Sequence, residues 1–196
     1  MTDIAYFQDK AILTSKNSIV RQINDYMLDL IPCEAKMYLS YDSSLSTNLN
    51  DDAIDVVHTP EFLNTINTPG LPNHKLRLKV GVPVMLLRNI DQRSGLCNGT
   101  RLIITRMGKL VPEGKVIFRS NICKKFFYTK FIFTPSDVMI PFKFQRRQFP
   151  IVVSFAMTIN KSQGQSLKKV EIYCQVMCFH MVTYILQYQE LPPEMD

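Results

Sequence analysis

The spacing of apolar residues changes twice along this chain of 196 residues, and this change constrains the fold more than any other feature. Residues 11–14 form an apolar run that is typical of a short buried strand. Residues 17–31 then carry apolar side chains at helical spacing, which stops before Pro32, and Ser15 or Asn17 is placed to cap this helix. A strand followed by a capped amphipathic helix is the repeating unit of α/β folds.

Beyond residue 76 the helical spacing disappears. Asn98-Gly99 and the stretch 112–114 have the chemistry of hairpin turns. Closely spaced strands with such turns predict a small antiparallel barrel. The strand-like runs are residues 76–90, 100–108, 114–118 and 124–133, and they follow an expected strand at 36–43 and a short helix at 59–66 capped by Thr59.

The α/β pattern returns near the end of the chain. Residues 149–155 read as a buried strand, residues 156–163 as a short helix ended by Gly164, and residues 168–174 as one more strand. We therefore expect an α/β domain that is built from both ends of the chain and interrupted by the barrel.

The charge is concentrated in the interrupting segment. Residues 74–147 carry 16 Lys and Arg against 3 Asp and Glu, a net +13, whereas residues 1–73 carry 4 against 10, a net −6. Such a one-sided field favours a polyanionic partner over a merely solvated basic surface. The basic candidates for phosphate contact are Arg88, Arg93, Arg101, Arg106, Lys124, Lys125, Arg146 and Arg147.

Other classes of protein are disfavoured by the sequence. No apolar run reaches the length of a membrane span, and the first residues lack the pattern of a signal peptide, so we expect an intracellular protein without a membrane partner. The five cysteines lack paired metal spacing and the three histidines are scattered, so we assign no metal site and expect reduced thiols.

The densest polar run is residues 158–165, TINKSQGQ, directly after the apolar segment 149–155. Hydroxyl, amide and ammonium donors suit phosphate oxygens, although a polar helix end capped by its own side chains would have the same composition. Among the aromatic residues of segment 126–133, some could stack on bases while most would fill the barrel core. These are Phe126, Phe127, Tyr128, Phe131 and Phe133.

Several ordered segments resemble the petite-integration-frequency (Pif) helicases, in particular their plant and transposon-associated branch. They are AILTSKN (11–17), the long run 71–102, TPSDVMIPFKFQRRQFP (134–150) and SFAMTINKSQGQSL (154–167). The resemblance implies a superfamily-one, ATP-dependent helicase that moves 5′ to 3′ on single-stranded DNA in the nucleus. It also implies roles in DNA repair, recombination and telomere maintenance.

The resemblance divides the chain into four parts. Residues 1–73 and 150–173 resemble a partial RecA-like motor domain, residues 74–149 an inserted barrel of the Src-homology-three kind, and residues 174–196 are a divergent tail. It implies DNA contacts for Thr158, Asn160, Lys161, Ser162, Asn17, Arg88, Arg146 and Arg147. Gln163, Gly164 and Gln165 would couple the DNA track to the nucleotide cleft.

Much of a helicase is absent from this sequence. The phosphate-binding pattern GxxxxGK[ST] does not occur, so ATP and Mg²⁺ of the family are not expected to bind well to this chain alone. We expect a fragment that is inactive by itself, with a separate chain as one source of the missing ATP-binding domain. The alternatives are a single-stranded-DNA-binding module without a motor, or a truncated gene remnant.

The tail from Cys174 does not follow the family's pattern. Read two bases later, codons for this tail permit Leu-Pro and then Phe-Ser-His-Gly-His-Leu-Tyr-Ile-Ala-Val-Ser-Arg, which resembles the family's next motif. We therefore hypothesise the loss of one base near the codon for Tyr173. A spliced or lineage-specific tail is the alternative, and sequencing the gene distinguishes the two.

Overall fold

The computed structural model describes Phe7 and residues 10–44, 59–68, 70–109, 111–116, 125–135, 140, 142–165, 167 and 169–173. The chain divides into two compact units. The terminal unit comprises residues 1–31 and 154–196, and the inserted unit comprises residues 32–153. The sequence placed the boundaries near residues 73 and 150, whereas this division follows Ile31 and Val153.

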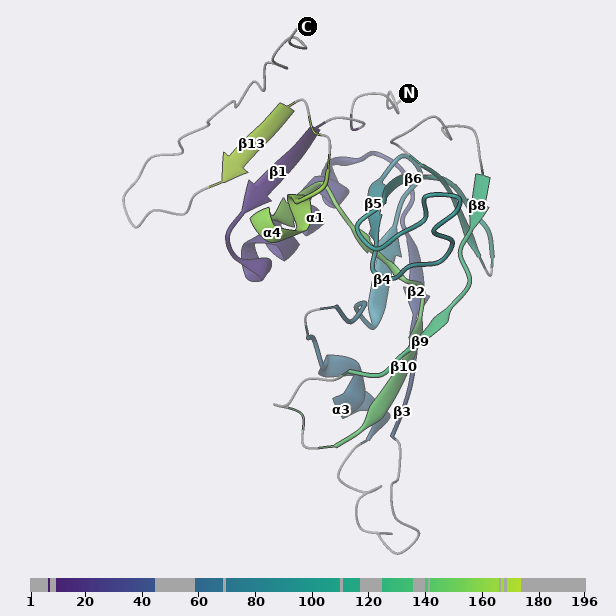
Figure 1. The fold of residues 1–196 in the computed structure, drawn as a ribbon. Coiled ribbons are helices and arrows are strands. Elements are labelled where there is room, and N and C mark those ends of the chain that lie inside the picture. The colour runs from purple at the N-terminus through teal and green to yellow at the C-terminus, as the bar shows by residue number, and fades with distance from the viewer. Residues whose placement is uncertain are drawn as a thin grey trace, which may run out of the picture. The chain divides into compact units, whose positions relative to one another are not determined.

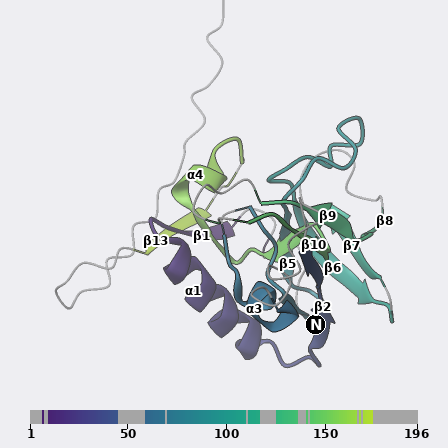
Figure 2. The same cartoon turned by 90° about the horizontal axis from the view of Figure 1, so that it is seen from below.

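The terminal unit contains a three-stranded parallel sheet in the order β12-β1-β13. Its strands are β1 (Lys10–Thr14), β12 (Ala156–Thr158) and β13 (Lys169–Tyr173), of which Figure 1 labels the neighbours β1 and β13. Parallel neighbours so far apart in sequence confirm the expectation that both ends of the chain build one α/β sheet. A helix, α1 (Asn17–Leu30), follows β1 and contacts β12 and β1 (Figure 2).

Helix α1 begins and ends close to the predicted positions. It stops at Leu30, before Pro32, as the helical spacing indicates. The predicted cap is wrong, because the N-cap residue is Lys16 and no side chain caps the helix. The buried face of the helix includes Ile19 and Leu28, whose burial rather than a cap therefore holds the helix in place.

The predicted helix at 156–163 is only half correct. Ala156–Thr158 form strand β12, with Ile12 opposite Ala156 in the parallel ladder, and α4 (Ile159–Ser162) is a single turn. The tertiary pairing with β1 overrides the helical pattern, because it buries Ala156 and Met157 in the sheet. Gly164, with φ of +75°, ends the turn as predicted.

The inserted unit contains three antiparallel sheets. The five-stranded sheet has the order β11-β5-β6-β7-β8, the three-stranded sheet β3-β10-β9, and the two-stranded sheet β2-β4. Their strands are β2 (Lys36–Leu39), β3 (Tyr41–Ser44), β4 (Lys75–Leu78), β5 (Pro83–Leu86), β6 (Arg101–Met107), β7 (Pro112–Val116), β8 (Lys125–Phe127), β9 (Phe131–Phe133), β10 (Phe144–Gln148) and β11 (Ile151–Val153).

A closed barrel is not formed by the described strands. Within that part of the chain, β11 pairs only with β5 and β8 only with β7, so the five-stranded sheet is open. The sequence also predicted that residues 149–155 return to the α/β sheet. Instead β11 is antiparallel to β5 within the inserted unit, and β12 makes the return.

The turns of the five-stranded sheet differ from the prediction at one position. Gly99, with φ of +88°, lies in the expected turn between β5 and β6. The stretch 112–114 lies inside β7, and the preceding turn is closed by the Gly108 N–H, which donates to the carbonyl of Val111. Glycine at 114 lets the ring of Tyr128 pack on β7, because a Cβ there would collide with that ring.

Helix α3 (Pro60–Thr65) has the predicted start, since the Thr59 hydroxyl accepts a hydrogen bond from the Phe62 N–H at 3.3 Å. No helix among the described residues is long and apolar enough to cross a membrane. The same residues contain no group of three His, Cys, Asp or Glu side chains that could hold a metal ion. Cys33 and Cys97 are free thiols, and the other cysteines lie outside the described residues.

Candidate nucleic-acid interface

The polar run 158–165 lies where two parallel strands end. Strand β1 ends at Thr14 and β12 at Thr158, and these two residues are opposite each other in the ladder. The segment that follows β1 contains Asn17, and the segment that follows β12 contains Asn160 and Lys161. In open α/β sheets, ligands bind outside the carboxyl ends of the strands. The fold therefore brings two of the sequence-predicted segments to one edge of the sheet.

The side chains of this edge differ in what they can offer a phosphate. Asn160 and Lys161 are exposed, as is Asn17. The Ser162 hydroxyl donates to the Ile159 carbonyl at 2.7 Å, so its only proton is used inside α4. Asn17, Asn160 and Lys161 are therefore accessible donors at this edge, whereas Ser162 supports the local turn.

Two cations interact at this edge. Partial desolvation of the Lys161 ammonium, together with the positive charge of Arg21, lowers the pKa of Lys161 below its ordinary value. Lys161 nevertheless keeps an accessible side chain. The positive charges of Lys161 and Arg21 at this edge favour a negatively charged ligand over a positively charged one.

The linking residues form a tight turn. Gln163 and Gly164 are exposed, and the N–H of Gln165 donates to the Ser162 carbonyl at 3.0 Å. Gly164 adopts the left-handed conformation that few other residues tolerate. This turn sets the direction in which the chain leaves α4. Its residues Gln163 and Gly164 are among those to which the resemblance gives the coupling role.

The arginines of the inserted unit fall into two groups. Arg88, Arg93, Arg106 and Arg147 are exposed, whereas Arg101 and Arg146 are buried. Burial lowers the pKa of Arg101 to about 10. Lys124 and the side chain of Lys125 lie outside the described residues. Only the exposed group is placed to contact a phosphate.

Arg146 was predicted to contact DNA, but its environment assigns it to the interior. Its side chain is completely buried and forms an ion pair with Asp42, with 2.6 Å between Nη2 and Oδ2. Its remaining N–H groups donate to the carbonyls of Leu63, Ile66 and Pro72 at 2.8–3.1 Å. The Nε–H also donates to Asp42, at 2.9 Å from Oδ2, so all five guanidinium protons are used and none remains for a phosphate.

Arg88 and Arg147 remain accessible. The Arg88 guanidinium lies 4.9 Å from the ring centroid of Phe133, a cation–π contact that orients it while leaving it exposed. Arg147 on β10 is opposite Tyr41 of β3 and Ile132 of β9. Tyr41 is 70% exposed and Ile132 58% exposed, so an arginine lies between two exposed apolar side chains.

Sequence reasoning did not single out Tyr41 or Ile132. The alternation of exposed and buried residues along β3 and β10 identifies them only once the cross-strand register is known. In the aromatic segment 126–133 only Tyr128 and Phe133 are buried, which is fewer than the majority expected to fill the core. Phe126 and Phe131 are half-buried, and Phe127 is 63% exposed.

Solved structures define the class of this fold. The chain is similar to Pif1 helicase from Candida albicans, with a TM-score of 0.62 and 23% identity over 84% of this chain and 38% of that chain. It is also similar to unliganded Pif1 from a Bacteroides species, with a TM-score of 0.56 and 21% identity over 87% of this chain and 48% of the other. The fold is thus the mixed α/β fold found in Pif1 helicases.

The sequence is similar to the same group of proteins. Residues 61–107 match the family model described as DNA helicase Pif1, 2B domain. The ATP-dependent DNA helicase PIF1 of Xenopus laevis is 28% identical over 159 residues, which are 76% of this chain and 21% of the relative. That of Rattus norvegicus is 32% identical over 124 residues, which are 62% of this chain and 18% of the relative. The chain therefore resembles Pif1 helicases and spans about a fifth of these curated relatives.

Proposed function

We propose that this chain belongs to the Pif1 group of superfamily-one DNA helicases, in its plant and transposon-associated branch. In this proposal the terminal unit is part of the second RecA-like motor domain, and the inserted unit corresponds to the 2B region. The observation that carries the proposal is the match of residues 61–107 to the Pif1 2B model. The convergence of Thr14 and Thr158 at one sheet edge supports it.

The proposed role of the chain is to bind single-stranded DNA as part of an ATP-dependent 5′-to-3′ helicase. Asn160, Lys161 and Asn17 would donate hydrogen bonds to the phosphate backbone from the terminal unit. Exposed arginines such as Arg88 and Arg147 would add charge from the inserted unit. A bound-DNA state is known for a relative, since one similar structure is Bacteroides Pif1 bound to single-stranded DNA.

We propose that ATP and Mg²⁺ do not bind well to this chain by itself. The sequence lacks the phosphate-binding loop, and the described residues lack a cluster of acids for a metal ion. We therefore propose that another segment or a separate chain supplies the nucleotide site. The purified chain is expected to show no ATP hydrolysis with single-stranded DNA present, and turnover by this chain would contradict the proposal.

Binding of DNA is tested by the anisotropy of a labelled single-stranded oligonucleotide over a range of salt. The logarithm of the binding constant should fall with the logarithm of salt concentration, by about 0.7 for each phosphate contact on a single strand. A binding constant that does not change with salt concentration would contradict the proposed DNA binding.

A matched pair of variants locates the contact. Lys161→Ala should weaken binding and make the salt slope shallower by about one contact. Lys169→Ala is the control, because Lys169 is an exposed lysine of the same unit opposite Lys10, at the amino end of β1 and far along the strand from Thr14. Equal weakening by both variants would show a general charge effect and would contradict a site at residues 158–165.

A module that binds single-stranded DNA without any motor is the second candidate, and the net +13 of residues 74–147 favours it. A reading frame with GxxxxGK[ST] in the genomic DNA upstream of the first codon would favour the helicase. We further propose nuclear localisation and a part in DNA repair, recombination and telomere maintenance. A fluorescent fusion tests the localisation.

A further inference from the structure

The five-stranded sheet carries a surface cavity near the end of β6 and the start of β7. Its volume is about 330 Å³, which lies within the range of roughly 300–1,000 Å³ that is typical of small-molecule sites. All of its lining residues belong to the inserted unit. They are Arg106, Gly108, Lys109, Val111, Glu113 and Phe127.

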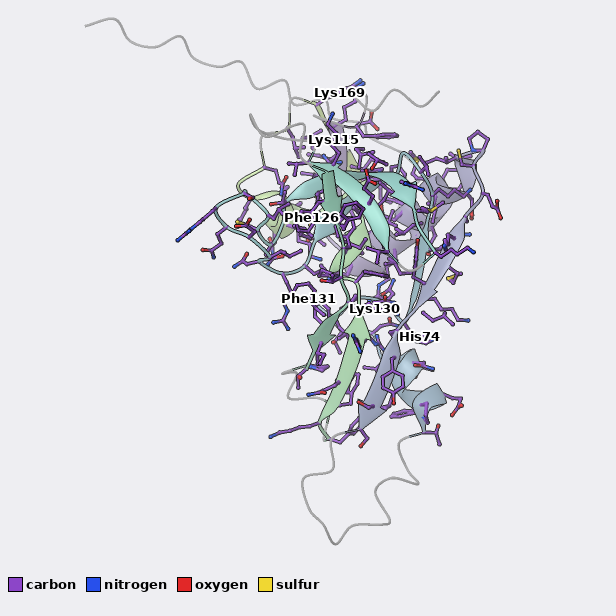
Figure 3. The ribbon with its side chains drawn as sticks, turned by 90° about the vertical axis from the view of Figure 1, so that its right-hand side faces the viewer. His74, Lys115, Phe126, Lys130, Phe131 and Lys169 are labelled. Carbon is purple, nitrogen blue, oxygen red and sulfur yellow. The ribbon has the colours of Figure 1, made fainter. Side chains whose placement is uncertain are left out.

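Phe127 is exposed because of strand alternation. Its neighbours Phe126 and Tyr128 turn to the opposite face, where their rings meet edge to face with 5.9 Å between centroids. Tyr128 is fully buried there, whereas Phe127 is 63% exposed. Phe126 and Lys115 lie on adjacent strands of this sheet (Figure 3). Phe127 is the exposed aromatic ring of the cavity lining, and its free face is available for stacking on a planar group.

The register places a cation beside this ring. Glu113 of β7 is opposite both Phe127 of β8 and Arg106 of β6, so the three residues form one row across the sheet. A β-bulge lies between Ile104 and Arg106. Bulges redirect side chains, and after this one Arg106 is exposed on a strand whose residues 101–104 are all buried.

The charge at the rim is positive. Arg106 and Lys109 are exposed, and Lys115 is half-buried on the same strand face as Glu113. Glu113 is itself buried and accepts a hydrogen bond from the Thr105 hydroxyl at 3.3 Å. The lining therefore combines two exposed cations, Arg106 and Lys109, with one buried carboxylate, Glu113, and this excess of positive charge favours an anionic ligand.

We propose that this cavity is a nucleobase subsite for single-stranded nucleic acid. A base stacks on Phe127, while Arg106 and Lys109 contact the adjacent phosphates. Neighbouring strands are about 4.8 Å apart, so the backbones that carry Phe127 and Arg106 are about 10 Å apart, with Glu113 on the strand between them. A base stacked on Phe127 therefore has its phosphate within reach of the long Arg106 side chain. An acidic peptide would satisfy the cations but would leave the exposed ring without a stacking partner. The inference rests on the proposed function, because it requires that the chain binds nucleic acid.

Tryptophan fluorescence tests this subsite directly, because the chain contains no tryptophan. In the full chain, Phe127→Trp introduces a single indole at the proposed stacking position. Addition of a single-stranded oligonucleotide should quench its fluorescence, whereas an oligonucleotide of abasic nucleotides should not. The matched control is Tyr26→Trp, since Tyr26 on α1 is 65% exposed and far from the cavity lining in sequence.

Affinity measurements complete the test. Phe127→Ala and Phe127→Leu should each weaken binding about 5- to 150-fold, the equivalent of the ~1–3 kcal/mol that base stacking contributes. Phe127→Tyr, which keeps the ring, should retain the affinity. Circular dichroism of each variant checks the fold.

The outcomes separate this inference from the proposed function. DNA binding that leaves the indole of the Phe127→Trp variant unquenched, together with unchanged affinity of Phe127→Ala, would overturn the subsite and leave the proposed function standing. No DNA binding by the unaltered chain would overturn both. Equal quenching by poly-glutamate would overturn the assignment of the cavity to a nucleobase.

Discussion

On strand β10, the adjacent residues Arg146 and Arg147 have opposite environments. Arg146 is fully buried and paired with Asp42, whereas Arg147 is exposed. The period of two along a strand places consecutive side chains on opposite faces, so identical residue types acquire different roles. Arg146 joins β10 to β3 and, through the carbonyls of Leu63 and Ile66, to α3.

Removal of the Arg146 side chain should destabilise the inserted unit strongly. Arg146→Ala leaves the Asp42 carboxylate buried without its counter-ion, and breaking such a pair costs about 3–5 kcal/mol. Urea denaturation followed by circular dichroism measures this cost. Arg147→Ala is the matched control and should change stability by no more than about 0.5 kcal/mol. Equal costs for the two variants would contradict the structural role of Arg146.

The pKa of His74 should make stability depend on pH. Burial lowers the pKa of His74, Asp42 partly opposes this shift, and Arg146 and Lys75 add to it. The unfolded chain therefore binds more protons than the folded chain just below pH ~6.5, so stability should rise with pH through that window. Below the folded pKa, both states are protonated and the destabilisation is complete.

Comparison with His74→Gln isolates this contribution. The variant should show a smaller rise in its urea midpoint between about pH 5 and 7 than the unaltered chain, because the carboxylates that titrate there are common to both. His74 Nδ1 lies 2.8 Å from the Ser40 hydroxyl, and glutamine retains a polar group near it. Parallel pH curves for the two proteins would refute the contribution.

At the scale of the elements, the side chain of Asn24 on α1 forms hydrogen bonds with strand β12. The Asn24 amide donates to the Ala156 carbonyl at 3.1 Å, and the Ala156 N–H donates to the Asn24 carbonyl oxygen at 2.8 Å. The Ile12 N–H donates to the Phe155 carbonyl, so the backbone groups of Ala156 point away from β1 in this parallel ladder. Asn24 thus occupies the edge of β12 as an additional strand would.

Loss of this pairing should destabilise the terminal unit. Asn24→Ala removes two hydrogen bonds and leaves buried backbone groups of β12 without those partners, at an expected cost of about 2–4 kcal/mol. Because β12 leads into residues 158–165, single-stranded-DNA binding should weaken as well. Amide hydrogen exchange at Ala156 measures the local effect. Gln22→Ala, at an exposed position of the same helix, should change neither property.

At the scale of the whole molecule, the two units differ in which parts of the chain they are built from. The inserted unit is one continuous segment, residues 32–153, whereas the terminal unit combines both ends of the chain. Strand β1 takes both of its sheet neighbours, β12 and β13, from beyond residue 153. Cutting the chain after Ile31 and after Val153 would therefore keep the strand pairings of the inserted unit and remove those of the terminal unit.

Residues 32–153 expressed alone should therefore fold, since every pairing of their three sheets lies within the segment. Residues 1–31 alone should remain unfolded, because a single strand and helix cannot bury their apolar faces. Proton–nitrogen correlation spectra of the two segments measure this difference. Dispersed signals from 1–31, or collapsed signals from 32–153, would contradict the division.

Most helices and strands could be predicted from the sequence. The prediction failed at segments whose conformation depends on pairing with a distant strand. The helical spacing of 17–31 and the Thr59 cap are local signals, so α1 and α3 lie where expected. Residues 156–158 carry no local signal for a strand, because only β1 beside them makes that conformation favourable. The barrel was predicted from turns and short strands, but sheet closure depends on which edges meet.

The candidate site could likewise be predicted from the sequence only in part. Composition alone identified the polar run 158–165 and the basic segment, because charge and donor chemistry are properties of single residues. It treated Arg146 and Arg147 alike, and it did not separate Phe127 from its buried neighbours. Exposure of these residues depends on strand face and register, which are fixed only when strands distant in sequence pair.

By itself, therefore, the sequence determined the α/β segments at both ends, the basic inserted segment and the resemblance to Pif1 helicases. Only the tertiary structure decided that the sheet of the inserted unit is open among the described strands, and that Arg146 lies inside while Phe127 faces a cavity. The physical reason is that periodicity and charge are local, whereas burial is set by cross-strand partners far away in the chain.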